Sequence, residues 1–313
     1  MLIVTVSVFA GAMMGFVLAR ISYLNAGGSA KSSFKSGASP GEWYWNNTGV
    51  YRIDISIHLG AILPAGFLMV WQFVPIIRHK FIMFHRINGY IIVLLVLIGN
   101  AGALMIARRA FGGGIETQAG VGTLVILTTT SIGLAYYNIQ RLQIDQHRAW
   151  MLRAMFYLGT IITLRLIMIL SALISTRLGK YYSTMSCEEM AFIYGSGSKT
   201  DKLYPQCSNL TGTFDGMVIV PAKFSNRPEQ IAVSLDLSFG MAMWLAIILH
   251  LVGVEIYLAL TPREGNRVRQ VSYERQLEQG FRFPGSAGLT ADRWGDAEEW
   301  QPIRIVVKDD IAR

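Results

Sequence analysis

The chain has 313 residues, of which 52% are hydrophobic and only 15% are charged. Soluble domains carry about 25% charged residues, and the mean hydropathy here is +0.39. These values exclude a disordered chain, a collagen-like chain and a small disulfide scaffold, and they disfavour a soluble two-domain enzyme. They predict an all-α polytopic membrane protein that contacts the lipid bilayer. The formal net charge of +8 is attributed to topology and lipid headgroups rather than to nucleic acid, because no zinc-finger or RNA-binding aromatic motif occurs.

Six stretches are long and apolar enough to cross a bilayer, which takes roughly 20 residues. The first stretch lacks the basic segment and the cleavage site of a signal peptide, so we expect a retained helix. The expected spans are Leu2–Leu24, Ile53–Ile77, Gly89–Ala107, Gln118–Ile139, Ala149–Thr176 and Val233–Thr261.

The distribution of Lys and Arg predicts the orientation of these spans. Basic residues gather in the connections Arg78–Asn88 and Arg141–Arg153 and in the segment that follows Thr261. Because these three segments alternate along the chain, all of them can face the cytosol together, with both termini on that side.

The opposite side of the membrane carries signals of a lumenal compartment. The only two cysteines, Cys187 and Cys207, lie in the long connection Arg177–Ile231, and two glycosylation sequons begin at Asn46 and Asn209. In an oxidising lumen the two cysteines are expected to form one disulfide, the alternative being two unrelated free thiols. We therefore predict the endoplasmic reticulum or another endomembrane as the location.

The chain is accordingly divided into four parts. Residues 1–24 form the first transmembrane helix and residues 25–52 a lumenal loop. Residues 53–261 form a five-helix membrane core that includes the lumenal loop 177–231. The cytosolic tail, residues 262–313, is expected to be largely irregular or to lie near the membrane surface.

Four short motifs, together with His58 in the second span, have the pattern of a known family. The motifs are Trp71-Gln72-Phe73, His85-Arg86-Ile87-Asn88-Gly89-Tyr90, His147-Arg148-Ala149-Trp150-Met151-Leu152-Arg153 and Leu164-Arg165-Leu166. On these motifs the chain resembles the predicted membrane protein family "domain of unknown function 2306" of bacteria and fungi. The resemblance covers about Ile53–Leu260, and the cysteine loop and the tail are similar to those of fungal members. It implies a helical membrane fold and no particular reaction.

Ionisable residues within a span are functional candidates, and four of them are singled out here. Asp54 and His58 share one face of the second span, and Asp236 lies about one turn inside the sixth. Arg165 is roughly 16 Å from the lumenal end of the fifth span, and its long side chain is expected to reach Asp54 or Asp236. Either a buried ion pair locks these helices together, or the four residues form a proton donor–acceptor site in a lumenal-half cavity.

Two histidines mark the cytosolic ends of spans. His85 and His147 are each followed by an arginine, and they are either interfacial anchors or the ligands of a b-type haem whose propionates face the arginines.

Three functions follow from these residues. The favoured hypothesis is a cofactor-free, terpene-cyclase-like enzyme that cyclises or isomerises a lipophilic terpenoid or meroterpenoid substrate in fungal secondary metabolism. In it, Asp54, Asp236 and His58 supply acid–base chemistry and Arg165 an electrostatic clamp. The alternatives are a haem-binding electron-transfer protein and a non-enzymatic scaffold or transporter. No metal motif occurs, and the oligomeric state stays open.

Overall fold

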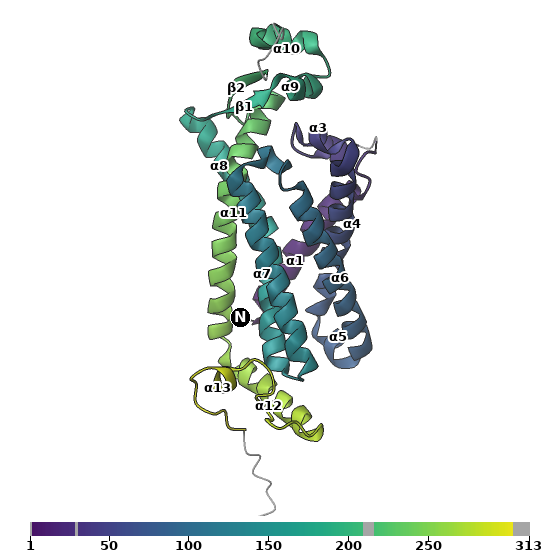
Figure 1. The fold of residues 1–313 in the computed structure, drawn as a ribbon, viewed down its shortest axis with the longest axis vertical. Coiled ribbons are helices and arrows are strands. Elements are labelled where there is room, and N and C mark those ends of the chain that lie inside the picture. Colours follow the sequence, from purple (N-terminus) through teal and green to yellow (C-terminus); the bar gives the residue numbers. More distant parts are fainter. Residues whose placement is uncertain (1, 29–30, 209–215, 303–313) are drawn as a thin grey trace, which may run out of the picture. The chain divides into compact units, whose positions relative to one another are not determined.

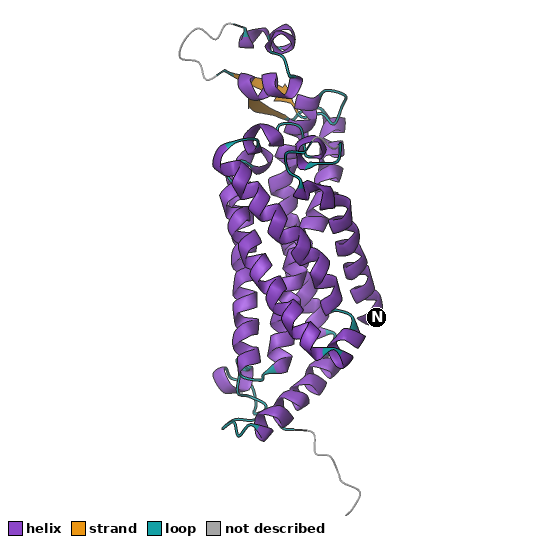
Figure 2. Cartoon of the chain, turned by 90° about the vertical axis from the view of Figure 1, so that its right-hand side faces the viewer, coloured by secondary structure: helices purple, strands orange, loops and turns teal. Residues whose placement is uncertain are grey.

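The computed structural model describes residues 2–28, 31–208 and 216–302. The chain divides into two compact units, each of which is described by itself. Unit 1 comprises Met1–Val125 and Gly159–Ile248, and unit 2 comprises Ile126–Leu158 and Leu249–Arg313. The described chain is mainly helical and contains one small sheet (Figure 1, Figure 2).

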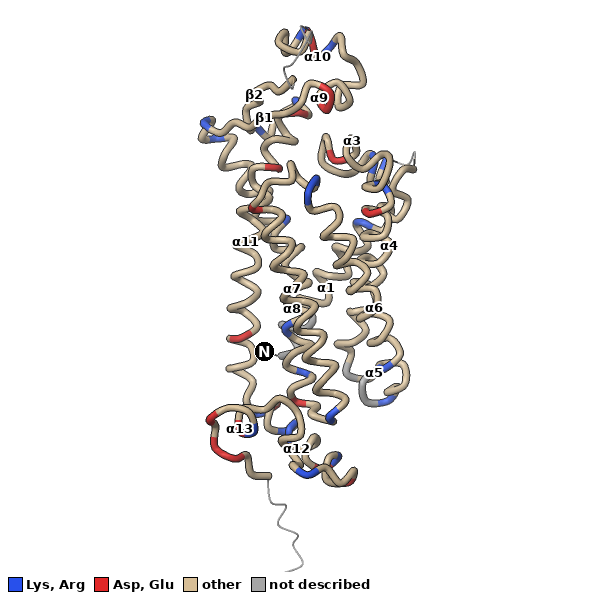
Figure 3. The backbone as a smooth tube through the Cα atoms, viewed as in Figure 1, with Lys and Arg blue, Asp and Glu red and all other residues tan. Residues whose placement is uncertain are grey.

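Among the described residues, five helices are long and apolar enough to span a membrane, which confirms an all-α, multi-pass membrane protein. Figure 3 shows how few charged residues lie along the middle of these helices. The first expected span is the helix α1, whose described apolar stretch is shorter than the other five. The long helices are α4 (Gly49–Gln72), α6 (Ile82–Ile106), α7 (Ile115–Gln140), α8 (Ile144–Leu178) and α11 (Pro228–Ala259).

Shorter elements connect and cap these helices. On the N-terminal side they are α1 (Leu2–Arg20), η1 (Ile21–Leu24), α2 (Phe34–Gly37), α3 (Glu42–Asn46), α5 (Pro75–Lys80) and η2 (Ala110–Gly113). The long connection after α8 contains β1 (Tyr182–Ser186), α9 (Cys187–Tyr194), α10 (Gly197–Leu203), η3 (Pro205–Cys207) and β2 (Met217–Pro221). After α11 the chain forms α12 (Pro262–Glu278) and α13 (Ala291–Trp294).

Helices α4 and α6 of unit 1 pack side by side (Figure 1). Their close approach depends on small residues, because a Cβ atom at Gly102 would lie 2.9 Å from the Cβ atom of His58. The imidazole of His58 donates from Nδ1 to the carbonyl oxygen of Gly99 at 2.8 Å. Small residues and interhelical hydrogen bonds are the usual means by which membrane helices associate.

The connection after α8 folds into an ordered lid, defined here as residues 182–208 and 216–221. Strands β1 and β2 pair antiparallel, with Tyr182 opposite Pro221, and the expected disulfide between Cys187 and Cys207 is present. Helix α9 begins at Cys187, and the hydroxyl of Ser186 caps it by accepting from the backbone N–H of Glu189 at 3.2 Å.

A buried carboxylate ties the lid to the start of α11. Glu229 is fully buried and accepts hydrogen bonds from the hydroxyls of Tyr194, at 2.6 Å, and Tyr204, at 3.1 Å. Arg227 completes the group with an ion pair of 2.8 Å. A buried carboxylate is costly unless its oxygen atoms have hydrogen-bond or charged partners, and Glu229 has both.

The described tail in unit 2 contains the helices α12 and α13, which corrects the expectation of a largely irregular segment; the alternative, a tail near the membrane surface, stays a prediction. Helix α12 turns its side chains toward the α7–α8 connection: Gln276 donates to the oxygen of the Gln143 side chain at 3.0 Å, and Ser272 donates to Asp145 at 2.9 Å. Gly288 then donates its backbone N–H to Gln143 at 3.0 Å. Polar side chains order this segment through hydrogen bonds, which is why hydropathy did not reveal it.

Candidate functional site

A buried carboxyl group lies on the short helix α3 of unit 1. Glu42 is 8% exposed, and its Oε1 atom accepts the backbone N–H of Phe111 at 2.7 Å. Burial raises the pKa of Glu42 from 4.5 to about 7, a shift that the Phe111 hydrogen bond and the charge of Arg165 oppose. A carboxyl group with this pKa can release or accept a proton near neutral pH.

Phe111 adopts a backbone conformation that is uncommon for a residue with a side chain. Its φ and ψ angles are 49° and 59°, in the left-handed region. Its ring stacks on Phe239 of α11 with the centroids 4.2 Å apart and the planes 5° from parallel. The backbone bond to Glu42 and this ring stack together hold Phe111 in place.

The guanidinium of Arg165 lies against the two stacked rings. Its central carbon is 4.6 Å from the ring centroid of Phe111 and 5.6 Å from that of Phe239. Both distances are within the range of a cation–π interaction.

Asp236 lies beside the same loop. A Cβ atom at Gly112, the residue after Phe111, would lie 3.2 Å from the Cβ atom of Asp236 and 3.4 Å from its carboxylate, and the φ angle of 74° favours glycine at this position. The charges of Glu42 and Glu189 act on Asp236. The α3 helix, the η2 turn and α11 thus bring acidic groups to one place.

The lid contributes Glu189 to this group. A Cβ atom at Gly41 would lie 2.5 Å from Glu189 Oε1, which places the carboxylate next to the start of α3. Burial raises the pKa of Glu189 to about 7, although the Trp45 side chain hydrogen-bonds to it and the charge of Arg109 lowers its pKa. The Arg109 guanidinium itself stacks 4.0 Å above the Trp45 ring.

We call Glu42, Glu189, Arg165 and Asp236 the acid–arginine cluster. Two of its members, Arg165 and Asp236, were predicted from the sequence, whereas Glu42 and Glu189 were missed because both lie outside the spans. The run of acidic and aromatic residues that begins with Glu42-Trp43-Tyr44-Trp45 is the signal that would have pointed to the first of them.

The expected ion pair between Arg165 and Asp54 or Asp236 is not formed within the described residues, so that prediction is wrong. Arg165 makes ring contacts instead, because Phe111 and Phe239 lie against it. Asp54 is buried on α4 at 4% exposure, and its carboxylate forms no hydrogen bond or ion pair with the described part of the chain. The described contacts of His58 are with α6.

The two histidines expected at a haem belong to different units, His85 to unit 1 and His147 to unit 2. His147 donates from Nδ1 to the carbonyl oxygen of Ala135 at 2.9 Å. This bond leaves Nε2 as the unprotonated nitrogen, which is the arrangement that a metal-ligating histidine uses.

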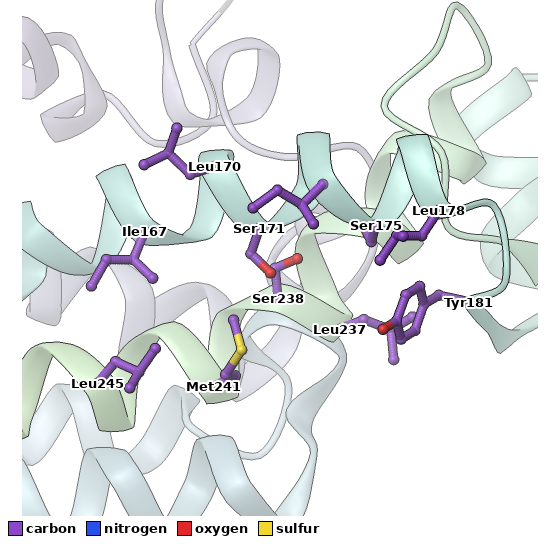
Figure 4. Close-up of a pocket in the computed structure, with 11 residues that line it drawn as sticks. Ile167, Leu170, Ser171, Ser175, Leu178, Tyr181, Leu237, Ser238, Met241 and Leu245 are labelled. Atoms are coloured by element: carbon purple, nitrogen blue, oxygen red, sulfur yellow. The ribbon is translucent and has the colours of Figure 1, made fainter.

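A groove of about 440 Å³ lies between α8 and α11 of unit 1 (Figure 4). Its walls are mostly apolar, and exposed residues such as Leu170, Ile174 and Met241 form them. Arg165 precedes the groove residue Ile167 by two positions, or about 200° around a helix. The groove therefore follows the opposite face of α8 from the acid–arginine cluster, and its composition suits lipid chains.

The two sequons differ in their surroundings. Asn46 is 3% exposed, and its side-chain amide donates to the carbonyl oxygen of Glu42 at 2.8 Å. A glycan is not accommodated there while this bond persists, so the structure does not favour the predicted glycosylation of Asn46. Asn209 lies outside the described residues.

Comparison with known proteins agrees with this architecture. Residues 55–187 match the family described as "Predicted membrane protein (DUF2306)". This match confirms the resemblance, and the DUF2306 segment contains His58, Phe111 and Arg165. Glu42, Glu189 and Asp236 lie outside the DUF2306 segment, in the parts of the chain that precede and follow it.

A relative from a fungus is also similar to the chain. "Ava biosynthesis cluster protein G" of Aspergillus versicolor is 24% identical over 276 residues, which cover 73% of this chain and 81% of the relative. No solved structure matches the chain significantly. The chain is thus a multi-pass membrane protein with a relative named for a fungal biosynthesis cluster.

Proposed function

We propose that the protein is a membrane enzyme that performs cofactor-free acid–base chemistry on a lipophilic terpenoid or meroterpenoid substrate. The observation that carries this proposal is the buried carboxyl of Glu42, which is bonded to the Phe111 loop and acted on by Arg165. The name of the fungal relative, which refers to a biosynthesis cluster, supports a biosynthetic role.

The proposed reaction is a proton-initiated cyclisation or isomerisation. A protonated carboxyl of the acid–arginine cluster donates its proton to an epoxide oxygen or an alkene carbon of the substrate. When the acceptor is an epoxide, its C–O bond breaks and an alkene attacks the resulting carbon to form a C–C bond. A carboxylate of the cluster then removes a proton from carbon, so the product is an isomer of the substrate.

The other parts of the site suit this chemistry. The stacked rings of Phe111 and Phe239 offer π faces, which attract cations. The disulfide-bonded lid brings Glu189 to the same place. Water exclusion by such a lid protects a reactive cation from hydrolysis.

The experiment measures product formation in microsomes that contain the full chain, with a farnesylated phenol epoxide as the probe. We expect Glu42→Gln and Asp236→Asn each to lower the rate at least ~100-fold, the usual contribution of a general acid or base. Glu188→Gln is the matched control, because Glu188 neighbours Glu189 but is exposed. Full product formation by both cluster variants would refute the proposed site.

A b-type haem protein is the second candidate, supported by the Nδ1 hydrogen bond of His147 to Ala135. When bound, the haem would supply electron transfer, with His147 as the ligand that unit 2 could offer. The purified full-length protein would then show a Soret band that His147→Ala abolishes. A spectrum without that band would remove this candidate.

A further inference from the structure

A groove of unit 1 runs between the spans α8 and α11 (Figure 4). The side chains of Leu170, Ile174 and Met241 in its walls are exposed, so the groove is open on the outside of this helix pair. Around the spans of a membrane protein this outside is occupied by lipid chains, because the hydrocarbon layer contains no water. The groove is thus continuous with the lipid contact of the spans.

The interior of the groove suits a hydrocarbon chain. Its volume of about 440 Å³ lies within the range of small-ligand sites, roughly 300–1,000 Å³. The hydroxyls of Ser175 and Ser238 in its walls donate to carbonyl oxygens of their own helices, to Ala172 at 3.0 Å and to Ser234 at 2.8 Å. These two hydroxyls therefore need no polar partner from a ligand, and most of the remaining wall is aliphatic.

One end of the groove lies where α8 ends and the lid begins. Leu178, the last residue of α8, and Tyr181 line this end. The segment that leads from β2 to α11 runs beside them. Ala222 donates its backbone N–H to the carbonyl oxygen of Tyr181 at 2.9 Å, and Phe224 donates its own to the hydroxyl of Thr176 at 2.7 Å. The two segments thus lie side by side at the mouth of the groove.

The mouth of the groove is basic. The two segments contribute Arg177, Lys180 and Lys223, all of which are exposed. Residues 166–187 and 217–228, which contain these segments, include no aspartate or glutamate. The charge at the mouth is therefore complementary to a phosphate group, whereas the groove behind it is complementary to an acyl chain.

We propose that the groove binds an anionic phospholipid from the leaflet on the lid side, with an acyl chain between α8 and α11 and the phosphate at Arg177, Lys180 and Lys223. A membrane lipid is favoured over a soluble phosphate because the groove continues the lipid contact of the spans. An anionic lipid is favoured over a neutral one because basic residues at a membrane surface attract anionic head groups. The site follows the face of α8 opposite to the acid–arginine cluster, so it is independent of the proposed function.

The test measures lipid binding by native mass spectrometry of the full chain in detergent. The probes are dioleoyl phosphatidylglycerol and dioleoyl phosphatidylcholine, which have the same chains and differ in net charge. We expect phosphatidylglycerol to bind about tenfold or more tightly, because each basic residue near a membrane surface favours an anionic lipid roughly fivefold. Glycerol phosphate, which lacks the chains, should not displace it.

A double substitution assigns the preference to the mouth of the groove. The variant with Lys180→Gln and Lys223→Gln should reduce the preference for phosphatidylglycerol at least ~fivefold and leave the binding of phosphatidylcholine unchanged. The variant with Lys199→Gln and Lys202→Gln is the matched control and should preserve the preference. Both control lysines are exposed on the lid helix α10, which contributes no residue to the groove.

A second substitution assigns the binding of the chain. Met241→Trp fills the groove and should weaken both lipids at least about tenfold, which corresponds to the lost burial of about two methylene groups. Met105→Trp on α6 is the matched control, because Met105 is 42% exposed and Met241 is 45% exposed. The lysine variants change only exposed side chains, so they remain informative if Met241→Trp fails to fold.

Equal binding of the two lipids by the wild-type protein overturns the inference. A preference that persists without Lys180 and Lys223, or that disappears equally in the Lys199 and Lys202 control, also overturns it, because the charge at the mouth would then not be responsible. Displacement by glycerol phosphate, or unchanged lipid binding by a folded Met241→Trp variant, would show that no chain occupies the groove.

Discussion

Glu42 illustrates how position decides the chemistry of a carboxyl group. On an exposed helix it would be ionised at neutral pH, but here it is nearly solvent-free and receives a single backbone N–H. Desolvation disfavours the charged form more than this bond and the charge of Arg165 favour it. The proton affinity of the site is therefore set by the packing of α3 under the η2 turn.

The pH dependence of stability should reveal this carboxyl. Because the pKa of Glu42 rises from 4.5 to about 7, the folded protein binds more protons than the unfolded chain between these values. The stabilisation is complete below about pH 4.5 and is lost as the pH rises through about 7, with a limit of about 3 kcal/mol. We expect the melting temperature of the detergent-solubilised protein to fall between pH 5.5 and 8, and to fall less in Glu42→Gln.

Glu189 supplies the control for that measurement. Its pKa is also raised to about 7, so Glu42→Gln should retain part of the pH dependence and the double variant with Glu189→Gln should lose most of it. A wild-type protein that becomes more stable at pH 8 would contradict the assignment.

At this scale the sequence revealed the residues that are unusual in their own segment. Arg165 and Asp236 are conspicuous because charges are rare in an apolar run. Glu42 and Glu189 are ordinary charges in polar connections, and only folding across 69 positions brings Glu42 to Phe111. Hydropathy carries no information about such a contact.

Among the elements, the lid helix α9 links a covalent bond to the site. Cys187 is its first residue, and Glu189 follows two positions later. The disulfide closes a loop with a sequence separation of 20, and loops of this size contribute about 3 kcal/mol. The position of Glu189 and the stability of the lid thus both depend on the disulfide between Cys187 and Cys207.

Removal of the disulfide should loosen the lid while the spans persist. In the double variant Cys187→Ser and Cys207→Ser, we expect faster hydrogen–deuterium exchange in α9 and unchanged exchange in α4 and α6. Mass spectrometry of the full-length protein measures both. Equal protection of α9 in the variant and the wild type would show that the tyrosine contacts to Glu229 hold the lid alone.

Helix α12 depends on an amide network in unit 2. Gln276 is fully buried, donates to the Arg141 carbonyl oxygen at 2.8 Å and accepts the Gly285 N–H at 2.7 Å. Gln276→Ala leaves these groups unpaired, at a cost of about 1–3 kcal/mol each. Limited proteolysis of the full chain should then cut the tail faster, whereas Gln279→Ala, an exposed control on the same segment, should not change the rate.

Tail cleavage at the wild-type rate in Gln276→Ala would refute this role of the network. The network also explains why the tail was expected to be irregular. Its order comes from buried Gln, Asn and Ser side chains, and composition does not distinguish a satisfied amide from a solvated one.

At the scale of the whole molecule, the positive charges and the cysteine pair predict an orientation in the membrane, with both termini in the cytosol and the lid in the lumen. The spans were predictable because bilayer thickness imposes a minimum apolar length. The packing of the spans against one another and the path of the lid were not predictable, because they depend on small-residue contacts such as that of Gly102 with His58.

Two modifications of intact microsomes test that orientation. A tag after Arg313 should be removed by external protease, whereas the lid should stay protected until the membrane is permeabilised. Endoglycosidase should shift the mobility of the wild-type chain, and Asn209→Gln, but not Asn46→Gln, should abolish the shift, because Asn46 is buried. A shift lost only in Asn46→Gln would show that α3 folds after glycosylation.

The left-handed conformation of Phe111 in the η2 turn depends on its hydrogen bond to Glu42. The N–H of Phe111 donates a hydrogen bond to the side chain of Glu42. An ionised carboxylate accepts such a bond more strongly than a protonated carboxyl group does. Deprotonation of Glu42 therefore strengthens its hydrogen bond to Phe111, a residue in a strained conformation, and protonation weakens this bond. Because the ring of Phe111 is stacked on Phe239 and lies against Arg165, the η2 turn couples the protonation state of Glu42 to side chains of α8 and α11.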